Sequence, residues 1–265
     1  ASEKDTIIPV FGVGEREFYG VKDKLSRYSN VDCSAMYSYA GESNQMHLYA
    51  QGKQQTLCSK HIGAPIPFKK IEPYLNAHGV LINMESGSDI SLETLDEIRL
   101  AIREKKTALH LDMHNLTLGT NPDYSRFPRQ MSDWRRWCFM VNSIQLNENE
   151  AAHLAMETYD NEMLAKQMLP LMVNALCITR GANGVTVYQQ EHKKLLTETI
   201  EGVAVKNVVD DSASGDIFGA AFFYNTCSSQ NNVEAARLAN AKAATSVSYS
   251  GEEKFLMLKE QEKAQ

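Results

Sequence analysis

The sequence predicts an α/β fold in which helices cover both faces of a mostly parallel central sheet. The first reason is that apolar, strand-like runs alternate with helix-like segments from about residue 70 onward, a pattern typical of such sheets. The second is a stretch of short strand-like runs, interrupted by glycines, at residues 32–59, which predicts a separate small β layer. With 265 residues, of which 43% are hydrophobic, the chain is long enough to bury a sizeable core.

Composition excludes several classes of protein. The net charge of -6 gives no electrostatic reason to expect a nucleic-acid partner. The five cysteines are scattered singly, which predicts neither a disulfide framework nor a CxxC metal site. No apolar run approaches the roughly 20 residues that span a bilayer, and residues 1–6 are too polar for a signal peptide. We therefore expect a cytoplasmic protein with no membrane partner.

The expected elements follow the chain in order. An apolar, β-branched run that closes in glycine predicts a buried strand at 7–14, and a helix is expected at 17–28. Antiparallel strands are expected in the small β layer, at 35–39 and 45–50. The later expected strands are 80–84, 108–112, 139–145, 175–179, 185–188 and 194–196. The later expected helices are 70–78, 92–105, 148–157, 162–173, 216–226 and 233–248.

Ligands of open parallel sheets bind beyond the carboxyl ends of the strands, so the residues that follow strands are the first candidates for a site. Four such places carry distinctive residues: 112–115, 147–150, 179–181 and 210–216.

Residues 208–216 end an extended stretch and open an apolar helix. Small residues let the backbone approach a ligand closely, and the unpaired N–H groups of a new helix attract phosphate. Asp216, in the first helical turn, is placed to accept the proton of a hydroxyl that attacks a γ-phosphate. The alternative is that Ser212 or Ser214 caps the helix and that Asp216 only complements its dipole. The functional interpretation predicts an anion hole made by Ala213, Ser214 and Gly215.

The same stretch resembles the D-T-x-G-A-G-D signature of the PfkB (ribokinase-like) carbohydrate kinase family. Asp210 and Asp216 match its acidic ends and Gly215 its last glycine, whereas Ala213 and Ser214 replace its first glycine and its alanine. The resemblance implies a ribokinase-like fold and a kinase with Asp216 as catalytic base. It implies ATP as the donor, a small sugar, sugar acid or nucleoside as the acceptor, and leaves room for a monovalent cation beside Asp210.

Two further motifs agree with this family in order and spacing. Asn147 and Glu150 resemble its N-x-x-E motif, which implies that they manage Mg²⁺ and its waters. Alone, such a pair would be interpreted as a helix cap and a charge that stabilises the helix dipole. The stretch 179–184 resembles the family's T-x-G-x-x-G turn along the nucleotide, and the run 238–244 its Ala-Asn-Ala helix near the adenine. The implied nucleotide-binding residues are Thr179, Gly181, Gly184 and Asn240.

The resemblance also implies a division of the chain. Residues 32–59 would form the lid that closes over the sugar and, in the family, often takes part in a dimer contact. Residues 1–31 and 60–265 would form the kinase core. The family's usual first strand and its Gly-Gly…Asn segment, which binds the sugar, are not found. We therefore expect either an incomplete copy of a longer protein or a chain that has lost this segment, so the substrate stays open.

Other functions have weaker support in the sequence. A non-catalytic nucleotide- or sugar-binding relative is favoured by the missing segment and by the two substitutions in the signature, but the retained Asp216 argues against it. A dehydrogenase is disfavoured because Glu17 stands where the fingerprint that begins at Gly12 needs glycine. No GxxxxGK[ST] motif indicates a P-loop kinase, and no G-x-S-x-G elbow indicates a hydrolase. Asp112 has no firm role, and His110 and His114 lack the spacing of zinc ligands on a shared helix face.

Overall fold

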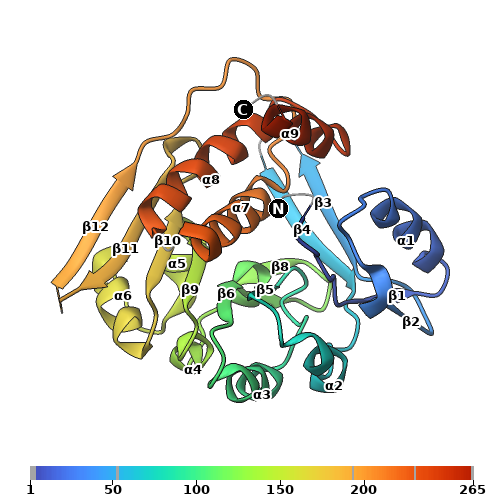
Figure 1. Ribbon diagram of the computed structural model, residues 1–265, viewed down its shortest axis with the longest axis horizontal. Helices are drawn as coiled ribbons and strands as arrows, with labels where there is room; N and C mark the ends of the chain where they lie inside the picture. The colour runs from blue at the N-terminus through green and yellow to red at the C-terminus, as the bar shows by residue number, and fades with distance from the viewer. Residues whose placement is uncertain (1–3, 52–53, 193, 230, 264–265) are drawn as a thin grey trace.

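A six-stranded mixed sheet forms the centre of the protein (Figure 1). The computed structural model describes residues 4–51, 54–192, 194–229 and 231–263. The strands follow the order β12-β11-β10-β9-β6-β5. Their bounds are β5 Gly79–Asn83, β6 Ala108–Asp112, β9 Ser143–Asn147, β10 Ala175–Thr179, β11 Val185–Glu191 and β12 Lys194–Ile200. Because β5, β6, β9 and β10 run parallel and only β11 runs antiparallel to its neighbours β10 and β12, the predicted α/β sheet is confirmed.

The register of the parallel strands brings their carboxyl ends to one edge. Asn83 pairs with Asp112, and Asp112 pairs in turn with Gln145. On the other side of β9, Asn147 pairs with Thr179. The residues that follow these strands therefore share one edge of the sheet, as ligand sites of parallel sheets do.

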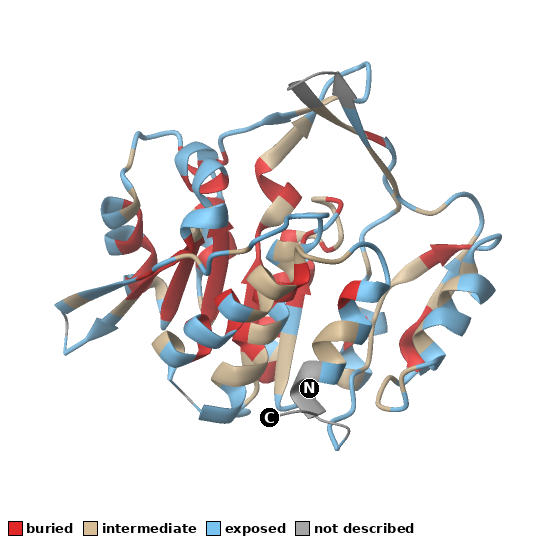
Figure 2. Cartoon of the chain, turned by 90° about the horizontal axis from the view of Figure 1, so that it is seen from above, coloured by how far each residue is buried: buried red, intermediate tan, exposed pale blue. Residues whose placement is uncertain are grey.

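Helices cover both faces of the sheet and bury two apolar cores. Side chains alternate along β10, so that Leu176 and Ile178 enter the larger core while Ala175 and Cys177 enter the smaller one. The smaller core lies under α7 (Ser214–Ser229) and α8 (Asn232–Ser246). Figure 2 shows the strands as a buried band between exposed helical surfaces. The larger core is covered by α3 (Leu92–Ile102), α4 (Trp134–Cys138), α5 (Glu148–Leu154) and α6 (Asn161–Met168).

The N-terminal region differs from the expectation. Only β1 (Gly12–Gly14) forms a strand in the run expected at 7–14, and Ile7 is 44% exposed, so the prediction of a buried strand there is wrong. The strand expected at 35–39 is also not part of an antiparallel pair, because β2 (Tyr37–Tyr39) pairs parallel with β1. The reason is that α1 (Phe18–Ser26) lies between them, and a helical crossover is the usual connection between parallel strands.

An antiparallel hairpin of β3 (Gln45–Gln51) and β4 (Gln54–His61) forms a sheet of its own, away from the central sheet (Figure 1). The strand expected at 45–50 is therefore antiparallel as predicted, but its partner is β4 and not the strand expected at 35–39. Its assignment as a lid, with boundaries at 32 and 59, stays a prediction.

The remaining elements are short or near the C-terminus. The helix expected at 70–78 is a short helix followed by a 3-10 turn that contains a proline. None of the described helices is long and apolar enough to cross a lipid bilayer. The sequence did not predict the last helix, α9 (Glu253–Lys263). The other short elements are α2 (Phe68–Ile71), β7 (Leu118–Thr120) and β8 (Arg126–Pro128).

Candidate active site

Asp216 lies in the first turn of α7, at the edge where the parallel strands end. Asn83, the last residue of β5, donates a hydrogen bond from Nδ2 to Asp216 Oδ1 at 2.6 Å. Burial raises the pKa of Asp216, and the charge of Glu85 raises it further, while His114 and the bond from Asn83 oppose the shift. A carboxylate with a raised pKa is the stronger base, so this environment favours proton transfer.

An imidazole lies among the carboxylates of this edge. Ligand atoms of Glu85, His114 and Asp216 all lie within 4.8 Å of one another. His114 Nε2 is 3.1 Å from Glu85 Oε2, and His114 Nδ1 is 4.0 Å from Glu150 Oε1. Burial opposes the charge of His114, but the contact with Glu85 and the charges of Asp112 and Asp216 outweigh it and raise its pKa to about 9. At neutral pH His114 is therefore a cation within 4.8 Å of the candidate base and 4.0 Å from Glu150.

Gln145 connects the turn before α7 to the sheet. Its Nε2 donates to Asp112 Oδ2 and to the carbonyl oxygen of Gly215, both at 3.0 Å. The helix can approach this closely because residue 219 is glycine: a Cβ there would lie 2.8 Å from Gln145 Oε1. Burial raises the pKa of Asp112 to about 8, with the charge of His114 partly offsetting it. Asp112, to which the sequence assigned no role, thus anchors the turn.

The backbone of the turn is open where the anion hole was expected. Ala213 and Gly215 are exposed, and the N–H groups of a first helical turn have no partner within the helix. Ala213 has a left-handed φ of 57°, a conformation that costs a residue with a Cβ roughly 1–2 kcal/mol. Ser212 does not cap the helix, because its hydroxyl bonds to Asp210 Oδ1 at 2.6 Å. The N–H of Ser214 bonds to the carbonyl oxygen of Asp211 at 3.3 Å.

Asn147 and Glu150 form a capping box at the start of α5. Asn147 Oδ1 accepts from the Glu150 N–H at 2.9 Å, while Glu150 Oε2 accepts from the Asn147 N–H at 2.8 Å. Burial raises the pKa of Glu150 to about 7. The pair therefore has the structural role considered from the sequence. The carboxylates of Glu150, Glu85 and Asp216 all lie near His114, and carboxylate oxygens are the donors that Mg²⁺ prefers; a role of Asn147 and Glu150 in metal binding stays a prediction.

Two of the expected nucleotide-binding residues, Gly184 and Asn240, border one segment, residues 200–202. Gly181 and Gly184 have left-handed φ values of 54° and 90°, and a Cβ at Gly184 would lie 2.1 Å from the carbonyl oxygen of Ile200. Asn240 is buried and donates to the carbonyl oxygen of Glu201 at 2.9 Å. Thr179 ends β10 beside Asn147. These bonds show what shapes the segment, whereas contact with a nucleotide stays a prediction.

A monovalent cation does not fit beside Asp210, because a lysine ammonium occupies that position. Lys254 of α9 is only 2% exposed. Its Nζ lies 3.0 Å from Asp210 Oδ2 and donates to the carbonyl oxygens of Asp210 and Ser212 at 2.8 and 2.6 Å. The bonds from Ser212 and Lys254 hold the pKa of Asp210 far below its usual range.

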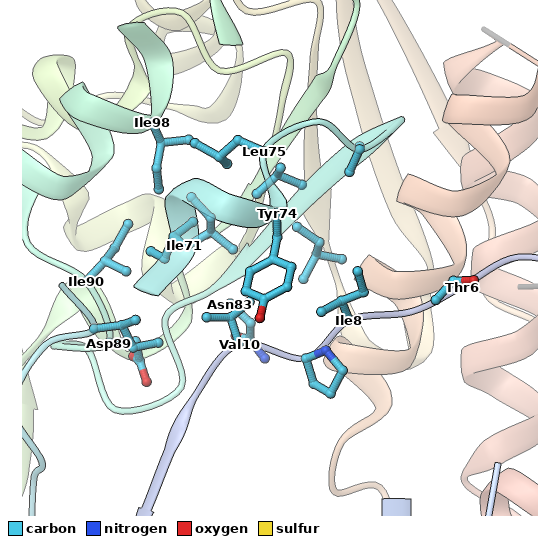
Figure 3. A pocket seen from close by; sticks show the side chains of 17 residues that line it. Thr6, Ile8, Val10, Ile71, Tyr74, Leu75, Asn83, Asp89, Ile90 and Ile98 are labelled. Atoms are coloured by element: carbon cyan, nitrogen blue, oxygen red, sulfur yellow. The ribbon is translucent and has the colours of Figure 1, made fainter. Parts of the chain in front are cut away.

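Beside the candidate base lies a cavity of about 280 Å³, which is largely apolar and is bounded by β5, α2 and the N-terminal segment (Figure 3). Asn83 and Asp89 are its polar side chains near the sheet edge. Asn83 therefore contacts both the cavity and Asp216, and its buried Oδ1 has no hydrogen-bond partner among the residues that the structure describes.

Sequence reasoning missed several residues of this site. Asn83 lies at the end of an expected strand and Glu85 follows it, so the same rule that selected the other candidates would have found them. His114 lay in the selected stretch 112–115, but the only specific role considered for it was that of a zinc ligand. Gln145 and Lys254 carry no motif, and their contacts join elements that are distant along the chain.

Comparisons with known proteins agree with this fold. A family model for the pfkB family carbohydrate kinases matches residues 89–256. A search of curated sequences found no match. The ribokinase of Thermotoga maritima has a similar structure, with a TM-score of 0.72 and 16% identity over 97% of this chain and 82% of that chain.

Two other solved structures show the range of similar proteins. A putative ribokinase II from E. coli, in complex with ATP and Mg²⁺, gives a TM-score of 0.74 and 14% identity over 98% of this chain and 84% of that chain. A pyrophosphate-dependent kinase in the ribokinase family gives a TM-score of 0.72 and 12% identity over 94% of this chain and 85% of that chain. At these identities the likeness shows the ribokinase-like fold. Because the family model covers more than half of the chain, including Asp216 and its turn, the protein belongs to the pfkB family of carbohydrate kinases.

Proposed function

We propose that the protein is an active kinase that transfers the γ-phosphoryl group of ATP to a hydroxyl of a small sugar, sugar acid or nucleoside. The observation that carries this proposal is the position of Asp216 directly beside the exposed turn of Ala213–Gly215, held by Asn83 at the carboxyl edge of the sheet. A carboxylate and a set of open backbone N–H groups at one point are what transfer to a hydroxyl requires.

Each group has a distinct task in the proposed reaction. Asp216 Oδ1 is engaged by Asn83, which leaves Oδ2 to accept the proton of the substrate hydroxyl as its oxygen attacks the phosphorus. The backbone N–H groups of Ala213 and Gly215 would bind the charge that develops on the transferred group, and the N–H of Ser214 would have to leave the carbonyl oxygen of Asp211 to join them. The cation at His114 favours the ionised form of Asp216, which is the form that acts as a base.

The donor would extend from this turn along the sheet edge. Asn147 and Glu150 would hold a hydrated Mg²⁺, which neutralises phosphate charge when it is bound. The nucleotide would lie along Thr179, Gly181, Gly184 and Asn240. The pairing of Asn147 with Thr179 in the sheet supports a shared ligand, because it places the two groups on adjacent strand ends.

Pyrophosphate is a second candidate donor, since pyrophosphate-dependent kinases are among the similar structures. The deciding experiment incubates the protein and Mg²⁺ with a panel of sugars, sugar acids and nucleosides, once with ATP and once with pyrophosphate. Phosphorylated product with release of ADP supports the proposal. Product formed with pyrophosphate but not with ATP would show that pyrophosphate is the donor. Binding of an acceptor or nucleotide with no product from either donor would establish a non-catalytic relative.

A further inference from the structure

The ammonium of Lys254 is bound as an isolated cation would be. Its nearest oxygens are Asp210 Oδ2 and the carbonyl oxygens of Asp210 and Ser212, with Ser212 Oγ at 3.5 Å. A lysine ammonium has three N–H donors, and these three closer oxygens satisfy all of them. Burial of such a charge is tolerated only with this kind of compensation. These oxygens therefore form a complete cation site, and the cation that fills it is a side chain of the protein itself.

The contact bears on the phosphate-binding turn through peptide geometry. In a trans peptide the C=O and the following N–H point in opposite directions. Lys254 binds the carbonyl oxygen of Ser212, so the N–H of Ala213 in the same peptide unit points away from the lysine. This N–H belongs to the proposed anion hole. Ala213 also holds a strained left-handed φ of 57°, which persists only where neighbouring contacts impose it.

We propose that Lys254 is a built-in cation that takes the place of a bound monovalent cation and positions the Ala213 N–H for phosphate. The stability and the activity of the protein are consequently independent of K⁺. The part of this inference that concerns phosphate rests on the proposed function, whereas the cation site rests on the contacts of Lys254 alone. Lys254 is a positioning residue, because it acts through the turn and touches no reacting atom.

The first test uses the wild-type chain without any ligand. Its melting temperature is measured in potassium chloride and in choline chloride of equal ionic strength. We expect the same melting temperature in both salts, because the oxygens that would bind K⁺ are already occupied. A wild-type melting temperature that rises specifically in potassium chloride would overturn the inference. This measurement needs neither a variant nor kinase activity, so it stands even if the variants do not fold or the proposed function fails.

The second test compares two substitutions of different size. Lys254→Ala removes the charge and opens the site, so we expect a melting temperature several degrees lower in choline chloride and partly restored by potassium or ammonium chloride. Lys254→Met removes the charge but keeps a long side chain in the site, so we expect a similar loss without restoration. Lys206→Ala, at an exposed lysine outside this contact, should melt like the wild type in every salt. A Lys254→Ala protein that melts like the wild type in choline chloride would refute the assignment.

A kinetic readout separates positioning from stability. If the panel identifies a substrate, Lys254→Ala in choline chloride should lose kcat more than it raises the KM of the acceptor. Potassium chloride should restore kcat for Lys254→Ala and leave that of Lys254→Met unchanged. Equal effects of potassium on both variants would contradict a vacated cation site.

Discussion

Two helix-opening turns of this protein are built in opposite ways. The turn before α5 is closed by its own side chains, because Asn147 and Glu150 satisfy each other's backbone N–H groups. The turn before α7 has an alanine at position 213, which has no side-chain oxygen to cap the helix, and both Ala213 and Gly215 are exposed. It is held instead through its carbonyl oxygens, by Lys254 at Ser212 and by Gln145 at Gly215.

The difference shows how a helix start can be rigid and still bind an anion. A capping box satisfies the orphan N–H groups of the first turn and thereby removes them as ligands for phosphate. Contacts to the carbonyl oxygens order the same backbone without themselves occupying its N–H groups. The first construction serves stability, and the second suits a site. The predictions below test this contrast.

The largest expected effect is at the open turn. Asp216→Asn should lower kcat by about 10²–10⁴-fold, or roughly 3–5 kcal/mol in barrier, because the amide cannot accept the substrate proton. The melting temperature should change little, since Asn can still bond to Asn83. The measurement is a steady-state assay with the substrate found in the panel. Asp133→Asn, at the exposed start of α4, serves as the matched control, and near-normal turnover in Asp216→Asn would rule out base catalysis by this residue.

The free energy of unfolding depends on pH through His110, whose ring stacks on that of Phe223 in α7 with centroids 5.5 Å apart. Burial lowers the pKa of His110 to about 3. Because its unfolded pKa is near 6.5, the unfolded chain binds a proton that the folded chain does not as pH falls below that value. This group alone should then cost about 1.4 kcal/mol of unfolding free energy per pH unit between roughly pH 6.5 and 3.

His110→Gln keeps a polar partner for Ser143 and removes the titration. Urea unfolding at several pH values should show a shallower loss of stability below pH 6.5 than in the wild type. Parallel curves for the two proteins would contradict the assignment of this proton to His110.

At the closed turn, Asn147→Ala should lower the free energy of unfolding by about 0.5–2 kcal/mol, because a helix cap is lost. If the pair also manages Mg²⁺, the variant should in addition need more Mg²⁺ for half-maximal rate. The control is Asp160→Ala, which removes the equivalent cap of α6, where Asp160 Oδ1 accepts from the Met163 N–H at 2.7 Å. We expect the control to lose similar stability with an unchanged Mg²⁺ requirement. The same requirement in both variants would assign Asn147 a structural role alone.

The smallest effect is expected from Ala213→Gly, which relieves a left-handed φ of 57°. The gain in stability should be about 1 kcal/mol or less, since the added backbone entropy of glycine offsets part of the strain. Thermal unfolding measures it, with Ala213→Val as the opposite change, because a β-branched residue is a poor fit at positive φ. A stable valine variant would indicate that the turn relaxes.

Much of the fold could be predicted because it follows from local patterns. The strand at Ala175–Thr179 has the bounds read from its apolar run, and α7 begins within two residues of the expected start. Alternation of strands and helices predicted the parallel sheet. The N-terminal pairing could not be predicted in the same way, because β1 and β2 are too short for a pattern to show whether they run parallel or antiparallel.

The sequence by itself determined the α/β class, the capping box at Asn147 and the small-residue turn that ends at Asp216, because each depends on neighbours along the chain. Only the tertiary structure decided that Asn83 holds the candidate base, which lies 133 residues away, and that Lys254 fills a cation site 42–44 residues before it. The reason is physical: a lone lysine or asparagine carries no periodicity. Its role depends on which atoms the packed sheet and helices bring within bonding distance.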